Sequence, residues 1–231
     1  MRGKRSHQVV AVLSGALLGL ALATTAAATT ITGSVTVPPN YTPPSPEAGA
    51  APFYWQEWNG FLEPRPRRLD PRRDIAIVLV GTGEAPPNEF NLSGGDLLPS
   101  VLVASPGSDV RIQNTDGCAH ELYSDDIEGL SALSTAPGNA RSFAAPANGH
   151  YQLRDRLYGH VDGHLHVISN LVARATPDGA GRYSFEGVEP GTYTVKVFHG
   201  EREISSTEVE IATTPVTIDP ITLQLAAAEE E

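Results

Sequence analysis

The sequence predicts an all-β fold. Short stretches rich in Val, Ile, Thr and Leu, bounded by turn residues, recur from residue 31 onward. The 22 glycines and 19 prolines are scattered along the chain, as expected for many short strands joined by tight turns. No long helical period stands out, and only residues 128–133 have a pattern compatible with a single helical turn.

The N-terminus has the pattern of a secretory signal peptide. Arg2, Lys4 and Arg5 precede an apolar run over residues 9–23, and small residues follow at 26–28. The run is shorter than the roughly 20 residues of a membrane span. We expect residues 1–28 to be removed, leaving a periplasmic, secreted or cell-surface protein with no membrane span.

Charge and cysteine content limit the classes of partner and the means by which the fold is stabilised. The formal net charge is −11, and loss of the three N-terminal cations makes the mature chain still more acidic. Such a balance argues against a nucleic-acid partner, which requires cationic groups on the protein. Cys118 is the only cysteine, so no internal disulfide forms and the core must hold the fold by itself.

The individual strands follow from local pattern. Residues 31–37 alternate and are β-branched, which predicts a first strand. Residues 38–52 are Pro-rich and predict a loop, whereas the apolar run at 75–80 is typical of a buried strand. Further strands are predicted at residues 100–104, 109–114, 121–124, 140–144, 149–153, 165–169, 208–211 and 216–225. Residues 227–231, which end in three glutamates, are predicted to form an acidic tail.

An aromatic and arginine-rich segment lies between the first two predicted strands. Trp55 and Trp58 belong to the one dense aromatic cluster, and Arg67 and Arg68 belong to a basic run that follows it. Because aromatic and Arg side chains are common interface anchors, this segment is a candidate surface for an unknown protein or glycan partner at the cell envelope. A long loop packed onto the sandwich is the alternative.

Residues 176–197 have the pattern T-x-D-G-x-G-x-Y-x-F-x-x-V-x-P-G-x-Y-x-V-x-V. Gly181 stands where a tight turn needs a positive φ or little bulk, and Tyr183 and Phe185 alternate onto one strand face. This pattern resembles the carboxypeptidase regulatory-like β-sandwich, which in other proteins is a structural or adhesion module.

A second pattern, N-x-D-x-x-x-H over residues 114–120, follows an apolar strand and a turn. It resembles the first half of a Greek-key cupredoxin (plastocyanin-like) domain, and the resemblance implies that His120 corresponds to the first copper ligand. The second half of such a domain carries a C-x-x-H-x-x-M loop. That loop, laid over residues 155–161, places Asp155, Tyr158 and Val161 at the ligand positions. The chain as a whole looks similar to exported plastocyanin-like proteins of a methylamine-utilisation-like group.

The two resemblances interleave along the chain. The first strands of the regulatory-like sandwich and the Pro- and Arg-rich loop fall at residues 29–83. The cupredoxin-like stretch falls at 84–169, and the remainder of the regulatory-like sandwich at 170–226. We expect the cupredoxin-like domain to be inserted in a discontinuous sandwich. One merged sandwich, or two side by side, is the alternative.

The metal chemistry of a cupredoxin needs ligands that this chain lacks at the matching positions. Blue copper requires a soft thiolate, two imidazoles and a weak axial thioether, yet the one methionine is Met1. Cys118 lies in the other loop, so it is either a small buried apolar residue or a non-standard ligand beside His120. Type-1 copper is therefore not expected, and no cofactor is expected.

Histidines cluster after residue 149, which leaves a different metal site open. His164 and His166 share a strand face, and with His160 or Asp162 they provide nitrogen and oxygen ligands suited to copper or zinc. If the two halves close, His120 joins His160 and His164. Structural or surface histidines are the alternative to such a site.

No catalytic pattern emerges. No serine stands in a G-x-S-x-G elbow, no H-E-x-x-H pair occurs, and residues 125–128 lack the spacing of a calcium loop. We therefore predict a non-enzymatic exported scaffold or binding protein. A periplasmic copper- or zinc-binding protein using His120 with His160, His164 or His166 is the second hypothesis, and an electron-transfer cupredoxin is the third.

Overall fold

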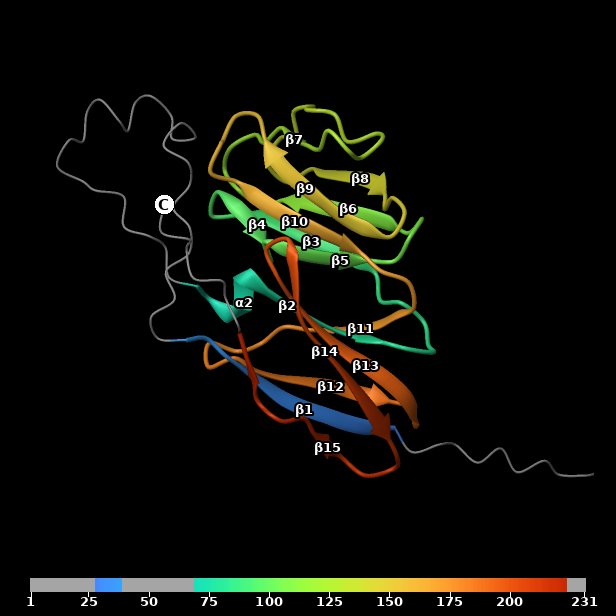
Figure 1. The fold of residues 1–231 in the computed structure, drawn as a ribbon. Helices are drawn as coiled ribbons and strands as arrows, with labels where there is room; N and C mark the ends of the chain where they lie inside the picture. Colours follow the sequence, from blue (N-terminus) through green and yellow to red (C-terminus); the bar gives the residue numbers. More distant parts are fainter. Residues whose placement is uncertain (1–27, 39–68, 224–231) are drawn as a thin grey trace, which may run out of the picture.

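The computed structural model describes residues 28–38 and 69–223, and the predicted all-β fold class is confirmed (Figure 1). In this part of the chain the one helix is α2 (Pro71–Asp74), a single turn capped by Asp70, whose side chain accepts a hydrogen bond from the backbone N–H of Arg72. Residues 128–133, for which the sequence allowed a helical turn, form a turn followed by irregular chain. Trp55, Trp58, Arg67, Arg68 and residues 1–27 lie outside the described residues.

The strands have the following bounds: β1 (Thr29–Thr36), β2 (Ile75–Val80), β3 (Asn88–Ser93), β4 (Asp96–Leu98), β5 (Val101–Ala104), β6 (Asp109–Asn114), β7 (Leu122–Tyr123), β8 (Ala140–Ala144), β9 (Gly149–Asp155), β10 (Asp162–Val167), β11 (Leu171–Ala175), β12 (Arg182–Val188), β13 (Gly191–His199), β14 (Arg202–Ile211), β15 (Val216–Thr217) and β16 (Ile221–Thr222).

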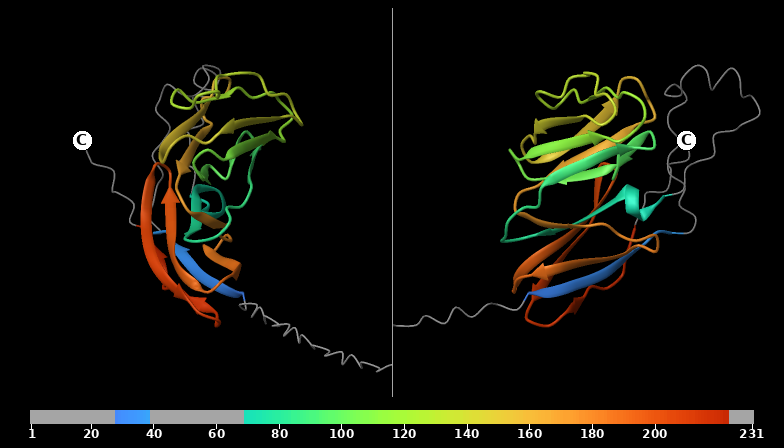
Figure 2. Two further views of the ribbon diagram at one scale, coloured as in Figure 1. Left: turned by 90° about the vertical axis from the view of Figure 1, so that its right-hand side faces the viewer. Right: turned by 180° about the vertical axis from the view of Figure 1, so that it is seen from behind.

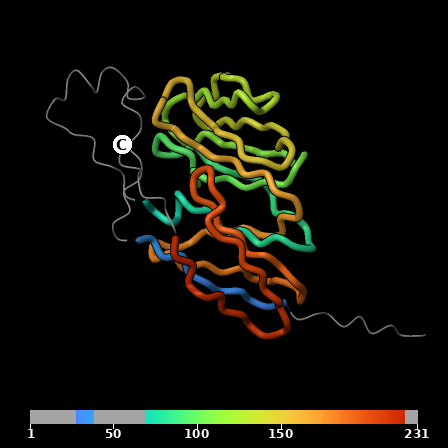
Figure 3. The backbone as a smooth tube through the Cα atoms, viewed as in Figure 1, coloured from blue at the N-terminus to red at the C-terminus, as the bar shows by residue number. Residues whose placement is uncertain are grey.

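Two pairs of sheets form two stacked sandwiches. The lower sandwich in Figure 1 consists of a sheet of order β12–β1–β15, with β16 also paired to β1, and a sheet of order β11–β2–β13–β14. The upper sandwich consists of sheets β4–β3–β6–β8 and β5–β10–β9–β7. The chain leaves the lower sandwich after β2, builds the upper one, and returns in β11, which pairs antiparallel with β2 (Figure 3).

Each sandwich has its own apolar core, built by strand alternation. In the lower one, Tyr183 and Phe185 point inward from β12, as the alternating pattern predicted, and pack with Ile31, Val188 and Val195. The upper core contains these buried residues: Phe90, Leu92, Leu97, Leu102, Val110, Ile112, Leu122, Phe143, Leu153, Val161 and Leu165.

A turn in the lower sandwich explains part of the D-G pattern. The Asp178 side chain accepts hydrogen bonds from the backbone N–H groups of Ala180 and Arg182, both at 2.9 Å. Gly181 has φ +78°, and a Cβ at this position would lie 2.0 Å from the carbonyl oxygen of Val35. Glycine is therefore required here for both its backbone conformation and its lack of a side chain.

The two sandwiches contact each other through a third apolar cluster, which consists of Val78, Val101, Val103, Leu171 and Phe198. The β13–β14 hairpin extends from the lower sandwich toward β5 and β10 (Figures 1 and 2). Arg174 adds a polar connection, because its Nε donates to the carbonyl oxygen of Val103 at 2.7 Å. Burial lowers the pKa of Arg174 to about 10. In the described part of the chain no helix is long and apolar enough to cross a membrane.

Candidate functional site

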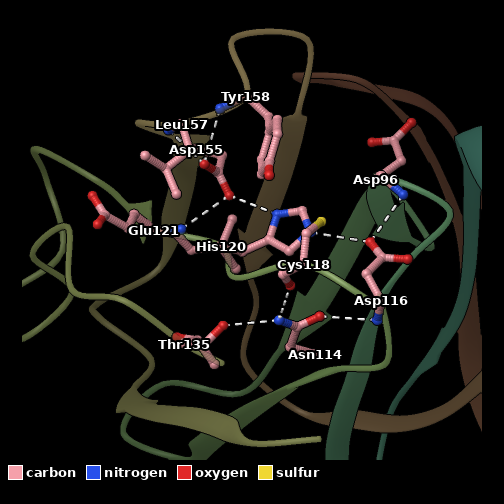
Figure 4. Close-up of polar contacts among 12 residues, drawn as sticks. Asp96, Asn114, Asp116, Cys118, His120, Glu121, Thr135, Asp155, Leu157 and Tyr158 are labelled. Atoms are coloured by element: carbon pink, nitrogen blue, oxygen red, sulfur yellow. Dashed lines mark hydrogen bonds and ion pairs between the residues drawn. The ribbon is translucent and has the colours of Figure 1, made fainter. Parts of the chain in front are cut away.

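His120 lies in the loop after β6, at one end of the upper sandwich, and is fully buried. Its backbone is fixed by a pair of hydrogen bonds with Thr135, at 3.1 and 2.7 Å. Asn114, at the start of the N-x-D-x-x-x-H pattern, donates from Nδ2 to the carbonyl oxygens of Cys118 and Thr135, both at 2.8 Å. The pattern therefore has a structural basis, since Asn114 shapes the loop that presents His120 (Figure 4).

Asp155 contacts one side of the imidazole. Its Oδ2 lies 2.8 Å from Nδ1 of His120, and the Asp155 side chain is completely buried. The same carboxylate accepts hydrogen bonds from the backbone N–H groups of Glu121 at 3.2 Å, Leu157 at 2.8 Å and Tyr158 at 3.1 Å. All four contacts are donors to a carboxylate that can only accept.

Asp116 contacts the other side. Its Oδ2 lies 3.0 Å from Nε2 of His120, and its two oxygens accept hydrogen bonds from the backbone N–H groups of Gly94 and Gly95. Burial alone would raise the pKa of Asp116, but the two backbone hydrogen bonds and the contact with His120 outweigh it and lower the pKa. Asp116 is therefore ionised at neutral pH.

His120 thus bridges two carboxylates, one at each ring nitrogen. Because an ionised carboxylate only accepts, each of these contacts requires a hydrogen on the ring nitrogen that faces the carboxylate. The charges join three connections of the upper sandwich: β3–β4 through Asp116, β6–β7 through His120 itself, and β9–β10 through Asp155. A ring nitrogen that carries such a hydrogen has no lone pair to offer a metal.

The other two positions of the overlaid copper loop are occupied by side chains of a different kind. The ring of Tyr158 lies 4.9 Å from that of His120, centroid to centroid, with 53° between the planes. Val161 is buried in the upper core. Asp155, Tyr158 and Val161 therefore offer two hard oxygens and a hydrocarbon, a set that does not fit type-1 copper, which needs a soft thiolate.

Cys118 is exposed, so the expectation that it is a small buried apolar residue is wrong. It lies in a loop rather than on a strand, and its Sγ is 3.7 Å from Nε2 of His120. A hydrogen bond with Cys118, followed by burial, raises the pKa of Tyr158. Asn114 donates a hydrogen bond to the backbone carbonyl oxygen of Cys118, and the Cys118 side chain remains exposed.

The histidines predicted to assemble with His120 have separate partners. His160 Nε2 lies 2.9 Å from the carbonyl oxygen of Gly95, and Tyr158 stands between the rings of His120 and His160. His166 Nε2 donates to the carbonyl oxygen of Gly200 at 2.8 Å. Among the described residues no group of three or more His, Cys, Asp or Glu side chains is arranged to hold a metal ion.

Sequence reasoning missed the contact between His150 and His164, whose Nε2 and Nδ1 atoms lie 3.0 Å apart. Both histidines were visible in the sequence, but their contact follows only from the pairing register of β9 with β10. His150 pairs with His166 across β9 and β10, so His150 and His164 are diagonal neighbours on one face. Without the length of the β9–β10 turn, that register is not determined.

No protein-family model and no curated protein sequence matches this chain. Solved structures of amicyanin are similar to part of it. The amicyanin of Paracoccus versutus is 15% identical with a TM-score of 0.33, over 37% of this chain and 84% of that one. A reduced Cu(I) form of an amicyanin variant at pH 4 is 16% identical with a TM-score of 0.32, over 36% and 82%. At this identity the likeness concerns the fold alone, and we draw nothing about function from it.

Proposed function

We propose that this chain is a non-enzymatic scaffold or binding protein of the cell envelope whose cupredoxin-like sandwich does not use type-1 copper. The observation that carries the proposal is the ion-pair arrangement around His120. Asp155 stands where the resemblance places the copper thiolate, and its carboxylate engages the imidazole directly at 2.8 Å. The position that carries a copper ligand in the resembled family is here occupied by a carboxylate that connects two loops.

The rest of the proposal concerns export and partners. The basic start and short apolar run at the N-terminus support export to the periplasm or cell surface. The acidic net charge disfavours nucleic acids and anionic surfaces. The binding partner we propose is a protein or glycan, contacted through the segment that contains Trp55, Trp58, Arg67 and Arg68.

Copper spectroscopy tests the first part. The mature protein is titrated with Cu(II), and the visible thiolate-to-copper absorption band is recorded. A triple variant, Asp155→Cys with Tyr158→His and Val161→Met, restores the ligand types at the overlaid positions and serves as a positive control. We expect no band in the wild type. A strong band in the wild type that disappears in His120→Ala would contradict the proposal and revive the electron-transfer hypothesis.

A binding assay tests the second part. The mature protein and a Trp55→Ala, Trp58→Ala variant are incubated with insoluble cell-wall glycan and with envelope protein fractions. An Arg67→Ala, Arg68→Ala variant separates the contribution of charge from that of the aromatic rings. We expect retention of the wild type to depend on at least one of these pairs. Equal retention of all three proteins would exclude this segment as the binding surface.

A further inference from the structure

A second group of histidines lies at the junction of the two sandwiches, away from the His120 site. His150, His164 and His166 occupy one face of the β9–β10 pair, while Leu153 and Leu165 point from the opposite face into the upper core. The tip of the β13–β14 hairpin lies over this face, because Gly200 accepts the hydrogen bond from His166. The ring of His166 also packs on Phe198, with 4.3 Å between ring centroids.

Within this group, His150 and His164 form a pair whose nitrogens face each other. Nε2 of His150 and Nδ1 of His164 are 3.0 Å apart, and the ring centroids are 5.2 Å apart. His150 is exposed, and the His164 side chain is 17% exposed, so a solute can reach both rings. His166 lies on the buried side of the pair and has its Nε2 committed to Gly200.

A carboxylate behind His164 determines which of its nitrogens is available. Asp162 Oδ2 lies 3.5 Å from Nε2 of His164, on the side of the ring away from His150. Asp162 is in turn held by Gln152, which donates to Oδ1 at 2.9 Å, and Gln152 accepts from Arg154. With its Nε2–H directed to Asp162, His164 presents the lone pair of Nδ1 toward His150. This is the carboxylate–histidine arrangement found behind metal-ligating imidazoles.

The separation of the two nitrogens matches two ligands of one metal ion. At a metal–nitrogen distance of about 2.1 Å, two imidazoles at a right angle lie about 3.0 Å apart. A right angle is the geometry of tetragonal Cu(II) and Ni(II) sites with nitrogen and oxygen ligands. Metal binding requires His150 to move its ring proton from Nε2 to Nδ1, with no net loss of a proton.

We infer that His150 and His164 form a binding site for a divalent transition-metal ion, with Cu(II) favoured, and that Asp162 positions His164 from behind. Water completes the coordination, because among the residues that the structure describes no third ligand side chain stands in place. Burial and then the charge of His164 lower the pKa of His150, and the negative charge of Glu201, on the hairpin tip, opposes this shift. The site uses neither His120 nor Cys118, so it is independent of the proposed function.

Binding is measured on the whole mature protein by calorimetric titration with Cu(II) and by electron paramagnetic resonance of the loaded protein. The variants are His150→Ala, His164→Ala and Asp162→Asn, with His160→Ala as the matched control, because His160 is bound to Gly95 in another part of the upper sandwich. Circular dichroism of each variant confirms that it is folded. The same titration with Zn(II) examines metal preference.

We expect one Cu(II) per chain with a two-nitrogen hyperfine pattern. His150→Ala and His164→Ala should each lose this site, and Asp162→Asn should weaken it by roughly 10- to 100-fold, as for other residues behind metal ligands. His160→Ala should bind as the wild type does. If both His150→Ala and His164→Ala retain wild-type affinity and the same resonance pattern, or if the wild type binds no Cu(II), the inference is wrong.

Discussion

The ion pairs around His120 predict a large effect for a very small change, Asp155→Asn. This substitution keeps the size and shape of the side chain and alters only its hydrogen bonding. In the native protein Oδ2 accepts from His120 and Glu121, and Oδ1 accepts from Leu157 and Tyr158. An asparagine has one accepting oxygen and one NH₂ group, so whichever way the amide turns, its NH₂ group faces donors.

The magnitude follows from what is left without a partner. If the amide oxygen faces His120, the N–H groups of Leu157 and Tyr158 lose their acceptor, at roughly 1–3 kcal/mol for each unsatisfied buried group. If it faces the two amides, the NH₂ group faces His120 and the buried pair between residue 155 and His120 is broken, at roughly 3–5 kcal/mol. Asp116 still contacts Nε2 of the ring, and water can reach the part-buried amides. We therefore expect a loss of about 3 kcal/mol in the free energy of unfolding of the upper sandwich.

Urea unfolding followed by far-ultraviolet circular dichroism measures this loss through the shift in midpoint at constant slope. Asp126→Asn, an exposed aspartate in the loop after β7, is the matched control and should change stability by less than about 0.5 kcal/mol. If Asp155→Asn unfolds at the same urea concentration as Asp126→Asn, the carboxylate does not act as the fourfold acceptor inferred here.

Three further predictions concern other parts of the molecule. Burial lowers the pKa of His166 to about 4, against an unfolded value of roughly 6.5, so His166 is neutral in the native protein and its contribution is complete above pH 6.5. The free energy of unfolding should fall as pH decreases from 6.5 toward 4, by at most roughly 3 kcal/mol from this residue. In that range the urea midpoint of His166→Gln should depend less on pH than the midpoint of the wild type does. Gly181→Ala should destabilise the protein by about 2 kcal/mol or more, because of its positive φ and the contact with Val35, whereas Gly179→Ala meets nothing within 4 Å and should be nearly neutral in thermal unfolding. Exposed Cys118 should react with a thiol reagent in the absence of denaturant at one equivalent per chain, and reaction only after unfolding would contradict its position.

Local sequence pattern determined the fold class and several of its strands. Alternation and β-branching located β6, β8 and most of β9 and β12, and in β6 buried and exposed residues alternate along most of the strand. The same pattern failed for β3, which alternates buried and exposed residues but carries the polar Asn88 at one of its buried positions. Asn88 is tolerated in a buried position because its side chain donates to Ser108 and to the carbonyl oxygen of Asp109, partners that no local pattern reveals.

The candidate sites were decided by tertiary structure. The sequence supplied His120 and, by overlay, the position of Asp155, but it did not show that their side chains form a buried pair 35 residues apart in the chain. It supplied His164 and His166 on one face, yet the partner of His164 is His150, which depends on the register of β9 against β10. A local pattern determines which face a side chain occupies. Only the pairing of distant strands determines which polar group meets it there, and that pairing decides whether a histidine is an ion-pair partner or an available ligand.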